Sequence, residues 1–377
     1  MYFSSLRTTA FRNLADEEIN VNAKDIFLIG ENGQGKTNFL EALYFCAYAS
    51  SFRAVRDAEL ARDSRLSHNG KNSQDSIPKA NEKDFSAEVK LAQSVNDNIL
   101  IKFENGKKNI FINGKRADDR KELLTIAPTI VFCHEDMEFV NGSPERRRWF
   151  FDQTLSLYDP VYLEDLRRFR RVLKSRNAVL RDYAQGKLSG SLDTLLDALD
   201  PQFAMYGGKL MEKREKAAQD FSAVLSPLYE DVSGISGINA RYIQSWKSDD
   251  FVSHLKQKRA ADTAAGLSLS GPHRDRYQIA HNGLDFTAAA STGQKRLLAL
   301  LLRAAQFRRF SEVTGQKPAL LLDDVLLEMD GEKRRRFLSA LPGYDQAFYT
   351  FLPEEPYRRY QKDDTLVYNV YGGMVRK

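Results

Sequence analysis

The chain of 377 residues is 42% hydrophobic and 28% charged, which is enough for one large domain or two ordinary ones with well-filled cores. Lys and Arg number 56 against 51 Asp and Glu, so the formal net charge of +5 permits a nucleic-acid partner without requiring one. Because only two cysteines occur, and neither a secretory signal nor an apolar run long enough to cross a bilayer is visible, we expect a reduced, cytoplasmic protein with no membrane partner.

Along the first fifty residues, the pattern predicts strands, a glycine-rich break and a helix. Residues 2–11 and 18–21 are typical of strands, and the short apolar run 25–29 (DIFLI) indicates a strand that is buried on both faces. Residues 30–35 interrupt this run, and residues 38–48 resume with helical periodicity.

Composition divides the rest of the chain into further stretches. A polar segment, residues 64–83, predicts a solvated loop, and strand patterns follow it as far as the pair Asn113 and Gly114, which marks a hairpin. The middle of the chain is typical of long helices, and the last hundred residues return to mixed strand and helix. We therefore predict an α/β fold: residues 1–140 and 265–377 form one discontinuous domain with mixed sheets, and residues 141–264 form an inserted, mainly helical lobe.

The glycine-rich break matches the phosphate-binding pattern G-x-x-x-x-G-K-[ST] at every specified position. Glycines let successive backbone N–H groups point at phosphate oxygens, and the following helix adds its positive N-terminal end. Lys36 would neutralise the β- and γ-phosphates of ATP, and the Thr37 hydroxyl would bind Mg²⁺. A glycine-rich turn that matches by chance is disfavoured, because the segment follows a buried strand and precedes a helix. The predicted nucleotide-binding residues of this loop are Gly30, Glu31, Asn32, Gly33, Gln34, Gly35, Lys36 and Thr37.

A second apolar run, residues 318–322 (PALLL), ends in two adjacent carboxylates. In a P-loop protein the first acid, Asp323, would hold Mg²⁺ together with Thr37, and the second, Asp324, would polarise the attacking water as general base. With Lys36, these two acids are the predicted catalytic residues. Taken alone, the pair is equally typical of an ordinary strand that ends in an acidic turn. The catalytic interpretation therefore depends on the presence of the phosphate loop in the same chain.

A third motif, Ser-Thr-Gly-Gln-Lys-Arg at residues 291–296, opens a strongly apolar helical pattern. A serine, a glycine and the free N–H groups at a helix start form a second anion site. One chain has no need of two such sites for one γ-phosphate, whereas two chains that face each other do. The segment therefore predicts an ATP-dependent homodimer, although standing alone it would be interpreted as an ordinary N-capped helix.

These segments together resemble the ATP-binding-cassette (ABC) heads of the SMC-like family of P-loop ATPases, and within it the RecF-type recombination proteins of bacteria. The resemblance implies an ABC-type ATPase head with nucleotide contacts from Arg12 and Asn13, and a D-loop aspartate at Asp330. It also implies contacts to ATP in trans from Ser291, Gly293 and Gln294. Three departures bear on the hydrolysis rate: the 291–296 motif lacks the family's additional glutamine, residues 346–350 lack the histidine of transporter-type cassettes, and His134 stands where the family has proline. The matching segments keep the family's order over almost the whole chain: FRNL (11–14), GENGQGKTNFLEAL (30–43), SFR (51–53), FCHED (132–136), GSPERRR (142–148), SGPHRD (270–275), STGQKR (291–296) and LLLDDVLLEMD (320–330).

The resemblance also implies a biological role, that of an ATPase switch in recombinational repair and replication restart. ATP held between two heads would close a dimer on double-stranded, gapped or junction DNA without sequence specificity. Slow, DNA-stimulated hydrolysis would then release the DNA. RecR is the partner that the resemblance implies, and together with RecO the closed dimer would promote the loading of RecA.

A basic helical segment, residues 162–183, is the first candidate for DNA contact. Its leucines and Phe169 fall near one face, which is typical of a buried stripe with a solvated charged face. The alternative is contact with the phosphate backbone, which needs Lys and Arg in number but no base readout. The candidate DNA-binding residues are Arg53, Arg56, Arg146, Arg167, Arg168, Arg171 and Lys174.

Two rival functions belong to other classes. An ABC transporter ATPase subunit would share both nucleotide motifs but should carry a switch histidine. A structural SMC-type tether would need long uninterrupted heptads, whereas Gly186, Gly190, Pro201 and Gly207 are expected to break the helical region. A turn is the preferred interpretation of residues 271–275 (GPHRD), with a catalytic histidine as the alternative.

Overall fold

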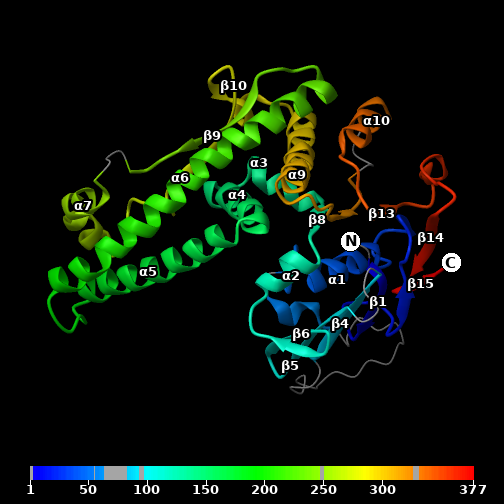
Figure 1. Cartoon of the computed structure of the whole chain (residues 1–377), viewed down its shortest axis with the longest axis horizontal. Helices are drawn as coiled ribbons and strands as arrows, with labels where there is room; N and C mark the ends of the chain where they lie inside the picture. Colours follow the sequence, from blue (N-terminus) through cyan, green and yellow to red (C-terminus); the bar gives the residue numbers. More distant parts are fainter. Residues whose placement is uncertain (1–2, 55, 63–82, 93–96, 247–249, 326–330) are drawn as a thin grey trace, which may run out of the picture. The chain divides into compact units, whose positions relative to one another are not determined.

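The computed structural model describes residues 3–54, 56–62, 83–92, 97–246, 250–325 and 331–377 (Figure 1). It divides into two compact units, one of Met1–Glu135 with Phe310–Lys377 and the other of Asp136–Arg309. The sequence placed the boundaries at residues 140 and 265 instead. The difference arises because β10 (Arg276–His281) pairs with β9 (Ile238–Ile243), so the chain after residue 265 folds with the helical unit. The loop predicted at 64–83 lies outside the described residues, except for Lys83.

The first unit contains a six-stranded sheet that aligns the glycine-rich segment, residues 30–37, with the acidic pair at residues 323 and 324. Its order is β15-β14-β3-β13-β12-β8, and every neighbouring pair is parallel except β14 with β15. In β3, β8, β12 and β13 every residue is buried, as a parallel sheet that is covered on both faces requires. The strands are β3 (Asp25–Ile29), β8 (Thr129–Phe132), β12 (Ala319–Leu322), β13 (Ala347–Phe351), β14 (Thr365–Tyr371) and β15 (Met374–Arg376).

The same unit holds an antiparallel sheet in the order β2-β1-β4-β5-β6-β7. The hairpin predicted at Asn113 and Gly114 is confirmed: both residues have positive φ, 53° and 73°, as a two-residue turn between β6 and β7 requires. The strands are β1 (Phe3–Thr9), β2 (Glu18–Asn20), β4 (Phe85–Leu91), β5 (Asn98–Glu104), β6 (Lys107–Ile112) and β7 (Lys115–Ala117). The helices are α1 (Lys36–Tyr48), η1 (Asp57–Leu60), α2 (Lys121–Ile126), α10 (Gly331–Ala340) and η5 (Tyr357–Arg359), with η4 (His134–Asp136) at the boundary of the two units.

The second unit is mainly helical, with a small antiparallel sheet in the order β11-β10-β9. The strand β9 lies inside the region where the sequence predicted helices alone. The elements are α3 (Met137–Asn141), α4 (Pro144–Tyr158), α5 (Pro160–Ala184), α6 (Leu192–Ser233), α7 (Phe251–Ala265), β11 (Leu284–Asp285), α8 (Phe286–Ala289) and α9 (Thr292–Thr314), whose last turn enters the first unit. Among the described residues, no helix is long and apolar enough to cross a membrane.

The expectation that Pro201 and Gly207 break the helical region is wrong, because α6 runs unbroken through 42 residues (Figure 1). Tertiary packing overrides the poor helix propensity of these residues. A side chain at Gly207 would place its Cβ 2.7 Å from the Trp246 ring, and one at Gly208 would lie 2.9 Å from Phe251. The glycines therefore allow close packing of α6 rather than ending it.

The buried face of α5 also differs from the predicted stripe. Leu166, Phe169 and Leu180 are buried as expected, but so is Arg176, whose guanidinium is fully enclosed. It donates to Asp200 at 2.8 Å and to Asp262 at 2.7 Å, so α5, α6 and α7 are joined by paired charges inside the unit. Such a pair is costly to break, because removal of one partner leaves a buried charge uncompensated.

Candidate nucleotide-binding site

The glycine-rich loop between β3 and α1 has the conformation that phosphate binding needs. Gly33 and Gly35 have φ of 77° and 119°, a region that glycine adopts without strain. The Lys36 ammonium is buried and donates to the carbonyl oxygens of Gly30 at 2.6 Å and Glu31 at 3.2 Å, which holds it inside the loop. Glu31, Asn32 and Gly33 are exposed, so the loop is open on one side.

The acidic pair lies beside this loop because parallel strands bring their carboxyl ends to one edge of the sheet. Asp323 follows β12, and its Oδ1 accepts a hydrogen bond from the Thr37 hydroxyl at 2.8 Å, across 286 residues of sequence. The structure thus brings together the P-loop and the first acid as the sequence predicted. The second acid, Asp324, has a φ of 52°, so its backbone turns sharply away from the strand.

Thr350, at the end of β13, connects both acids and was not identified from the sequence. Its hydroxyl donates to Asp324 at 2.8 Å and lies 3.3 Å from Asp323, and it accepts from the Asp324 backbone N–H at 2.7 Å. The sequence drew attention to residues 346–350 because they lack a histidine. Thr350 lies beside the acids because β13 lies between β3 and β12 in the sheet, and the strand order alone shows this.

The donor set at this edge fits Mg²⁺. Burial raises the pKa of Asp323 to about 7, and the neighbouring Asp324 carboxylate adds to the rise, so a cation would be stabilised there. Hydroxyl and carboxylate oxygens are the ligands that Mg²⁺ prefers, usually completed by phosphate oxygens and water. No cluster of three or more His, Cys, Asp or Glu able to hold a metal occurs in the part of the chain that the structure describes. Because Thr37 and Asp323 supply two ligands, phosphate oxygens of a nucleotide and water would complete a Mg²⁺ site there.

A buried carboxylate, Glu41 on α1, joins two arginines beside the loop. Arg12 Nε donates to it at 2.9 Å and Arg53 Nη2 at 2.7 Å, and the Ser51 hydroxyl also donates to it. Burial alone would raise the pKa of Glu41, but the hydrogen bond from Arg12 and the charge of Arg53 outweigh it and lower the pKa overall. Arg53, predicted to contact DNA, is thus held in an ion pair next to the phosphate loop. No sequence signal distinguished Glu41 from other helical positions.

The C-terminal hairpin of β14 and β15 supports the loop from a third side. The backbone N–H of Gly373 donates to Gln34 O, and that of Gly372 donates to Gln34 Oε1, each at 2.8 Å. A Cβ at Gly373 would lie 1.7 Å from the carbonyl oxygen of Asn13, so only glycine fits. Asn13 in turn accepts from the Asn38 side chain at 2.7 Å and donates weakly to Gly33 O at 3.4 Å.

The motif at residues 291–296 lies in the second unit and begins α9 with reciprocal capping. The Gln294 side chain accepts from the Ser291 N–H at 2.8 Å, and Ser291 Oγ accepts from the Gln294 N–H at 3.3 Å. Ser291, Thr292 and Gly293 are exposed, and the Tyr229 hydroxyl donates to Gln294 O at 3.2 Å. Asp330, the proposed D-loop aspartate, lies outside the described residues.

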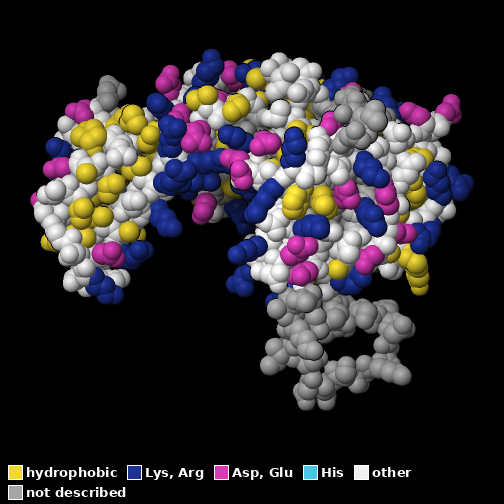
Figure 2. Space-filling model, turned by 60° about the horizontal axis from the view of Figure 1, so that its bottom comes forward, with side chains coloured by type: hydrophobic (Ala, Val, Ile, Leu, Met, Phe, Trp, Pro, Cys, Tyr) yellow, Lys and Arg dark blue, Asp and Glu magenta, His cyan; other side chains and the backbone are white. Residues whose placement is uncertain are grey.

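Most of the predicted DNA-binding residues lie on the surface of the second unit, on whose visible face Lys and Arg side chains gather in Figure 2. Arg146 on α4 and Arg168, Arg171 and Lys174 on α5 are exposed, whereas Arg167 is half-buried. Arg168 is paired with Glu164 at 3.2 Å. Arg56 is exposed in the first unit.

Residues 271–275 form a turn at the centre of the second unit. The Arg274 N–H donates to the Gly271 carbonyl at 2.8 Å, and Gly271 has a φ of 127°. Burial lowers the pKa of His273 to about 4, and the nearby arginines contribute, so this imidazole is neutral at pH 7. Its Nε2 lies 2.9 Å from the Ser268 carbonyl.

The phosphate loop, the acidic pair and the parallel sheet that aligns them define a P-loop protein of the ABC type. Residues 2–362 match the model of the RecF/RecN/SMC N-terminal domain, and the chain belongs to that family.

Similar proteins cover almost the whole chain. The DNA replication and repair protein RecF of Treponema pallidum is 40% identical over 366 residues, which span 96% of this chain and 97% of that protein. RecF of Clostridium perfringens strain SM101 is 31% identical over the full length of both chains. The solved structure of the recombination mediator protein RecF with ATP, of the RecFOR pathway, superposes with a TM-score of 0.83 at 27% identity, covering 100% of this chain and 97% of that one. An Smc head bound to the C-terminal winged-helix domain of ScpA shares the fold, with a TM-score of 0.55 at 16% identity over 100% of this chain and 96% of that one.

Proposed function

We propose that this chain is an ATP-dependent DNA-binding protein of recombinational repair and replication restart. Two copies close on ATP, the closed dimer holds gapped or junction DNA without sequence specificity, and slow, DNA-stimulated hydrolysis releases it. RecR is the direct partner, and with RecO the dimer promotes the loading of RecA. The names of the curated relatives and of the ATP-bound structure support this proposal.

The observation that carries the proposal is the contact between Thr37 and Asp323 at 2.8 Å. It joins the two motifs that bind and activate a nucleoside triphosphate at one sheet edge, although they are far apart in the sequence. Lys36 is proposed to neutralise the β- and γ-phosphates, with residues of the loop after Gly30, whose own N–H donates to Phe351 O, donating backbone N–H groups. Bound Mg²⁺ would supply charge neutralisation, and Thr37 and Asp323 would hold it. Arg12 and Asn13 are proposed to complete the nucleotide contacts in cis.

Asp324 is proposed to accept the proton of the attacking water. The hydrogen bond from Thr350 fixes the orientation of its carboxylate, as a general base requires. Across the dimer, Ser291, Gly293 and Gln294 of one copy would face the phosphate loop of the other, and Asp330 is proposed as the D-loop aspartate. Ser291 Oγ accepts a hydrogen bond from its own helix, so its hydroxyl proton stays available to a phosphate oxygen.

DNA contact is proposed for the exposed basic residues of α4 and α5, with Arg56 as a further contact. These are Lys and Arg side chains without a base-reading motif, which suits binding to the phosphate backbone. Because such binding releases counterions, its affinity should fall steeply as the salt concentration rises. Arg53 remains a weaker candidate, since it is paired with Glu41.

Sedimentation of the purified protein with and without ATP and a gapped duplex tests the proposal. We expect a monomer without ATP, a dimer with ATP and a dimer–DNA complex with both. The Asp324→Asn variant should bind ATP, hydrolyse it at least about a hundredfold more slowly, and stay dimeric on DNA. Asp363→Asn, an exposed acid outside the site, is the matched control. If Asp324→Asn remained a monomer with ATP, the switch mechanism would be wrong.

A further inference from the structure

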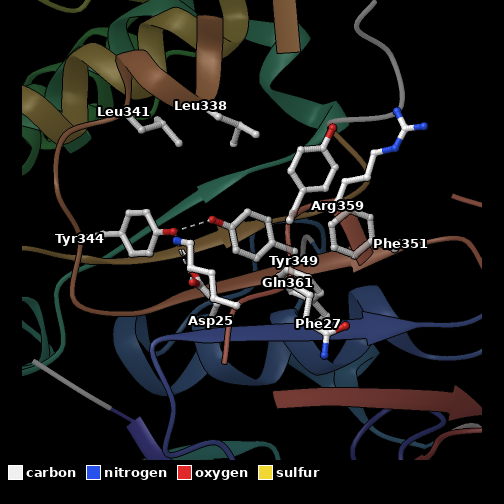
Figure 3. A pocket seen from close by; sticks show the side chains of 11 residues that line it. Asp25, Phe27, Leu338, Leu341, Tyr344, Tyr349, Phe351, Arg359 and Gln361 are labelled. Carbon is white, nitrogen blue, oxygen red and sulfur yellow. Dashed lines mark hydrogen bonds and ion pairs between the residues drawn. The ribbon is translucent and has the colours of Figure 1, made fainter. Parts of the chain in front are cut away.

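A second concave site lies in the first unit, on the sheet that carries the phosphate loop but at different residues. Its volume is about 310 Å³, which is in the range of small-ligand pockets. The wall comes from β3, β13, α10 and the segment after η5 (Figure 3). Asp25 is the first residue of β3, so it lies five residues, or roughly 16 Å along an extended strand, before Gly30 at the start of the phosphate loop.

Aromatic rings form one side of this pocket. Phe351 and Tyr360 lie nearly parallel, with ring centres 6.3 Å apart and planes inclined by 7°. Tyr349 is inclined by 16° to Phe351 at 6.1 Å, and Phe27 packs edge-on against Phe351 at 5.0 Å. Leu338 of α10 and Leu341, which directly follows this helix, approach from the opposite side in Figure 3. Such a pocket suits a flat, unsaturated ring.

A buried carboxylate gives the pocket a specific hydrogen-bond acceptor. Asp25 is 2% exposed, and its Oδ1 accepts from the Tyr344 hydroxyl at 2.8 Å. Because the Tyr344 proton is used there, the Tyr349 hydroxyl is the donor in the 3.0 Å contact between the two tyrosines. Among the described residues, the contact of Asp25 Oδ2 is a long one, 3.4 Å, to Lys362, whose side chain is 60% exposed and can move away. The pocket thus offers an acceptor to N–H groups of a ligand.

Two cations lie at the entrance. Lys362 and Arg359 line the pocket and are exposed, and Arg359 points away from the rings toward its rim in Figure 3. The helix that supplies Leu338 also carries the exposed Lys333, Arg335 and Arg336. Aromatic faces at the bottom with Lys and Arg at the rim are the combination by which proteins bind single-stranded nucleic acid.

From these features we propose that the pocket binds one nucleobase of single-stranded DNA, whose flanking phosphates contact Arg359 and Lys362. The base stacks on the aromatic wall, and its amino group donates to Asp25. Guanine, which carries adjacent N1–H and N2–H donors, fits a carboxylate best, whereas thymine offers a single N–H between two carbonyl oxygens. The inference deepens the proposed function: the pocket would recognise the unpaired strand at a gap, apart from the duplex.

Binding of a fluorescent single-stranded pentanucleotide, followed by anisotropy, tests this assignment. The measurement uses the full chain in a Lys36→Ala background, so that the phosphate loop does not contribute. We expect oligo-dG to bind more tightly than oligo-dT, and Arg359→Ala to weaken binding about tenfold. Arg358→Ala is the matched control, since this neighbouring exposed arginine is not among the residues that line the pocket. Its affinity should stay within about twofold.

Two further variants distinguish binding of the pentanucleotide in the pocket from non-specific electrostatic binding. Leu338→Trp fills the pocket and should abolish binding of the pentanucleotide, with an unchanged circular dichroism spectrum and melting temperature to confirm folding. Asp25→Asn should remove the preference for dG over dT. The assignment is overturned if Arg359→Ala and folded Leu338→Trp bind as the parent does, if no pentanucleotide binds, or if dGMP alone binds as tightly as the oligonucleotide. If the protein formed no ATP-dependent complex with the gapped duplex but bound the pentanucleotide as expected, the proposed function would be refuted and the pocket would not.

Discussion

The two halves of the proposed ATP site are built in different ways. The half in the first unit is held by several strands and a helix, with Thr37, Asp323 and Thr350 joined by hydrogen bonds at one sheet edge. The half in the second unit is one helix start, where Ser291 and Gln294 cap each other and leave exposed groups. A sheet edge can hold a nucleotide by itself, whereas a capped helix start offers a phosphate only a few N–H groups and a hydroxyl. We therefore expect that nucleotide binding and dimer closure can be separated by mutation.

The largest effect is expected from mixing two inactive variants. Lys36→Ala should lose ATP affinity by about a hundredfold or more, because it removes the ammonium inside the loop. Ser291→Ala should bind ATP normally but fail to dimerise. In a mixture, the intact phosphate loop of the Ser291→Ala chain meets the intact Ser291 of the other chain. We therefore expect ATP-dependent dimers and hydrolysis to return in the mixture alone.

The control for this experiment is a mixture of Lys36→Ala with Lys36→Ala,Ser291→Ala, in which no complete site can form. The measurements are sedimentation with ATP and the release of phosphate. Dimers formed by Ser291→Ala on its own would contradict the role of the second half-site in closure. If both variants are folded and the mixture neither dimerises nor hydrolyses ATP, contact in trans between Ser291 and the phosphate loop would be contradicted.

The motif residues could be predicted from the sequence, but the contacts that orient them could not. The phosphate loop was recognisable because its residues are contiguous, and the acids because they end an apolar strand. Thr350 and the C-terminal hairpin carry no local signal, since they meet the loop through the strand order β14-β3-β13-β12. Glu41 on α1 carries none either, because its partners Arg12 and Arg53 reach it only in the folded chain. In the second unit, Pro201 and Gly207 predicted breaks that do not occur, because packing against Trp246 decides the path of α6.

A smaller effect is expected when the hairpin can no longer approach the loop. In Gly373→Ala, the added methyl would collide with the Asn13 carbonyl, and the residue would have to keep a φ of 84°. We expect a loss of about 2 kcal/mol in the free energy of unfolding, measured in urea, and weaker ATP binding. Gly343→Ala, which meets nothing within 4 Å, is the control and should change stability by no more than about 0.5 kcal/mol. Equal stabilities for the two variants would show that the hairpin does not depend on this close approach.

The smallest effect is expected at Thr350, which orients an acid without touching the phosphate loop. Thr350→Val keeps the size and the β-branched shape that β13 requires but removes the hydroxyl that donates to Asp324. Because a hydrogen bond to a charged group contributes at least about 1.5 kcal/mol, we expect hydrolysis to slow about tenfold. ATP affinity and ATP-dependent dimerisation should be unchanged, since Lys36, Thr37 and Ser291 are intact. Thr9→Val, at an exposed position of β1, controls for the substitution itself. A fall in ATP affinity that matched the fall in rate would mean that Thr350 supports binding, and that the two acids do not have separate roles.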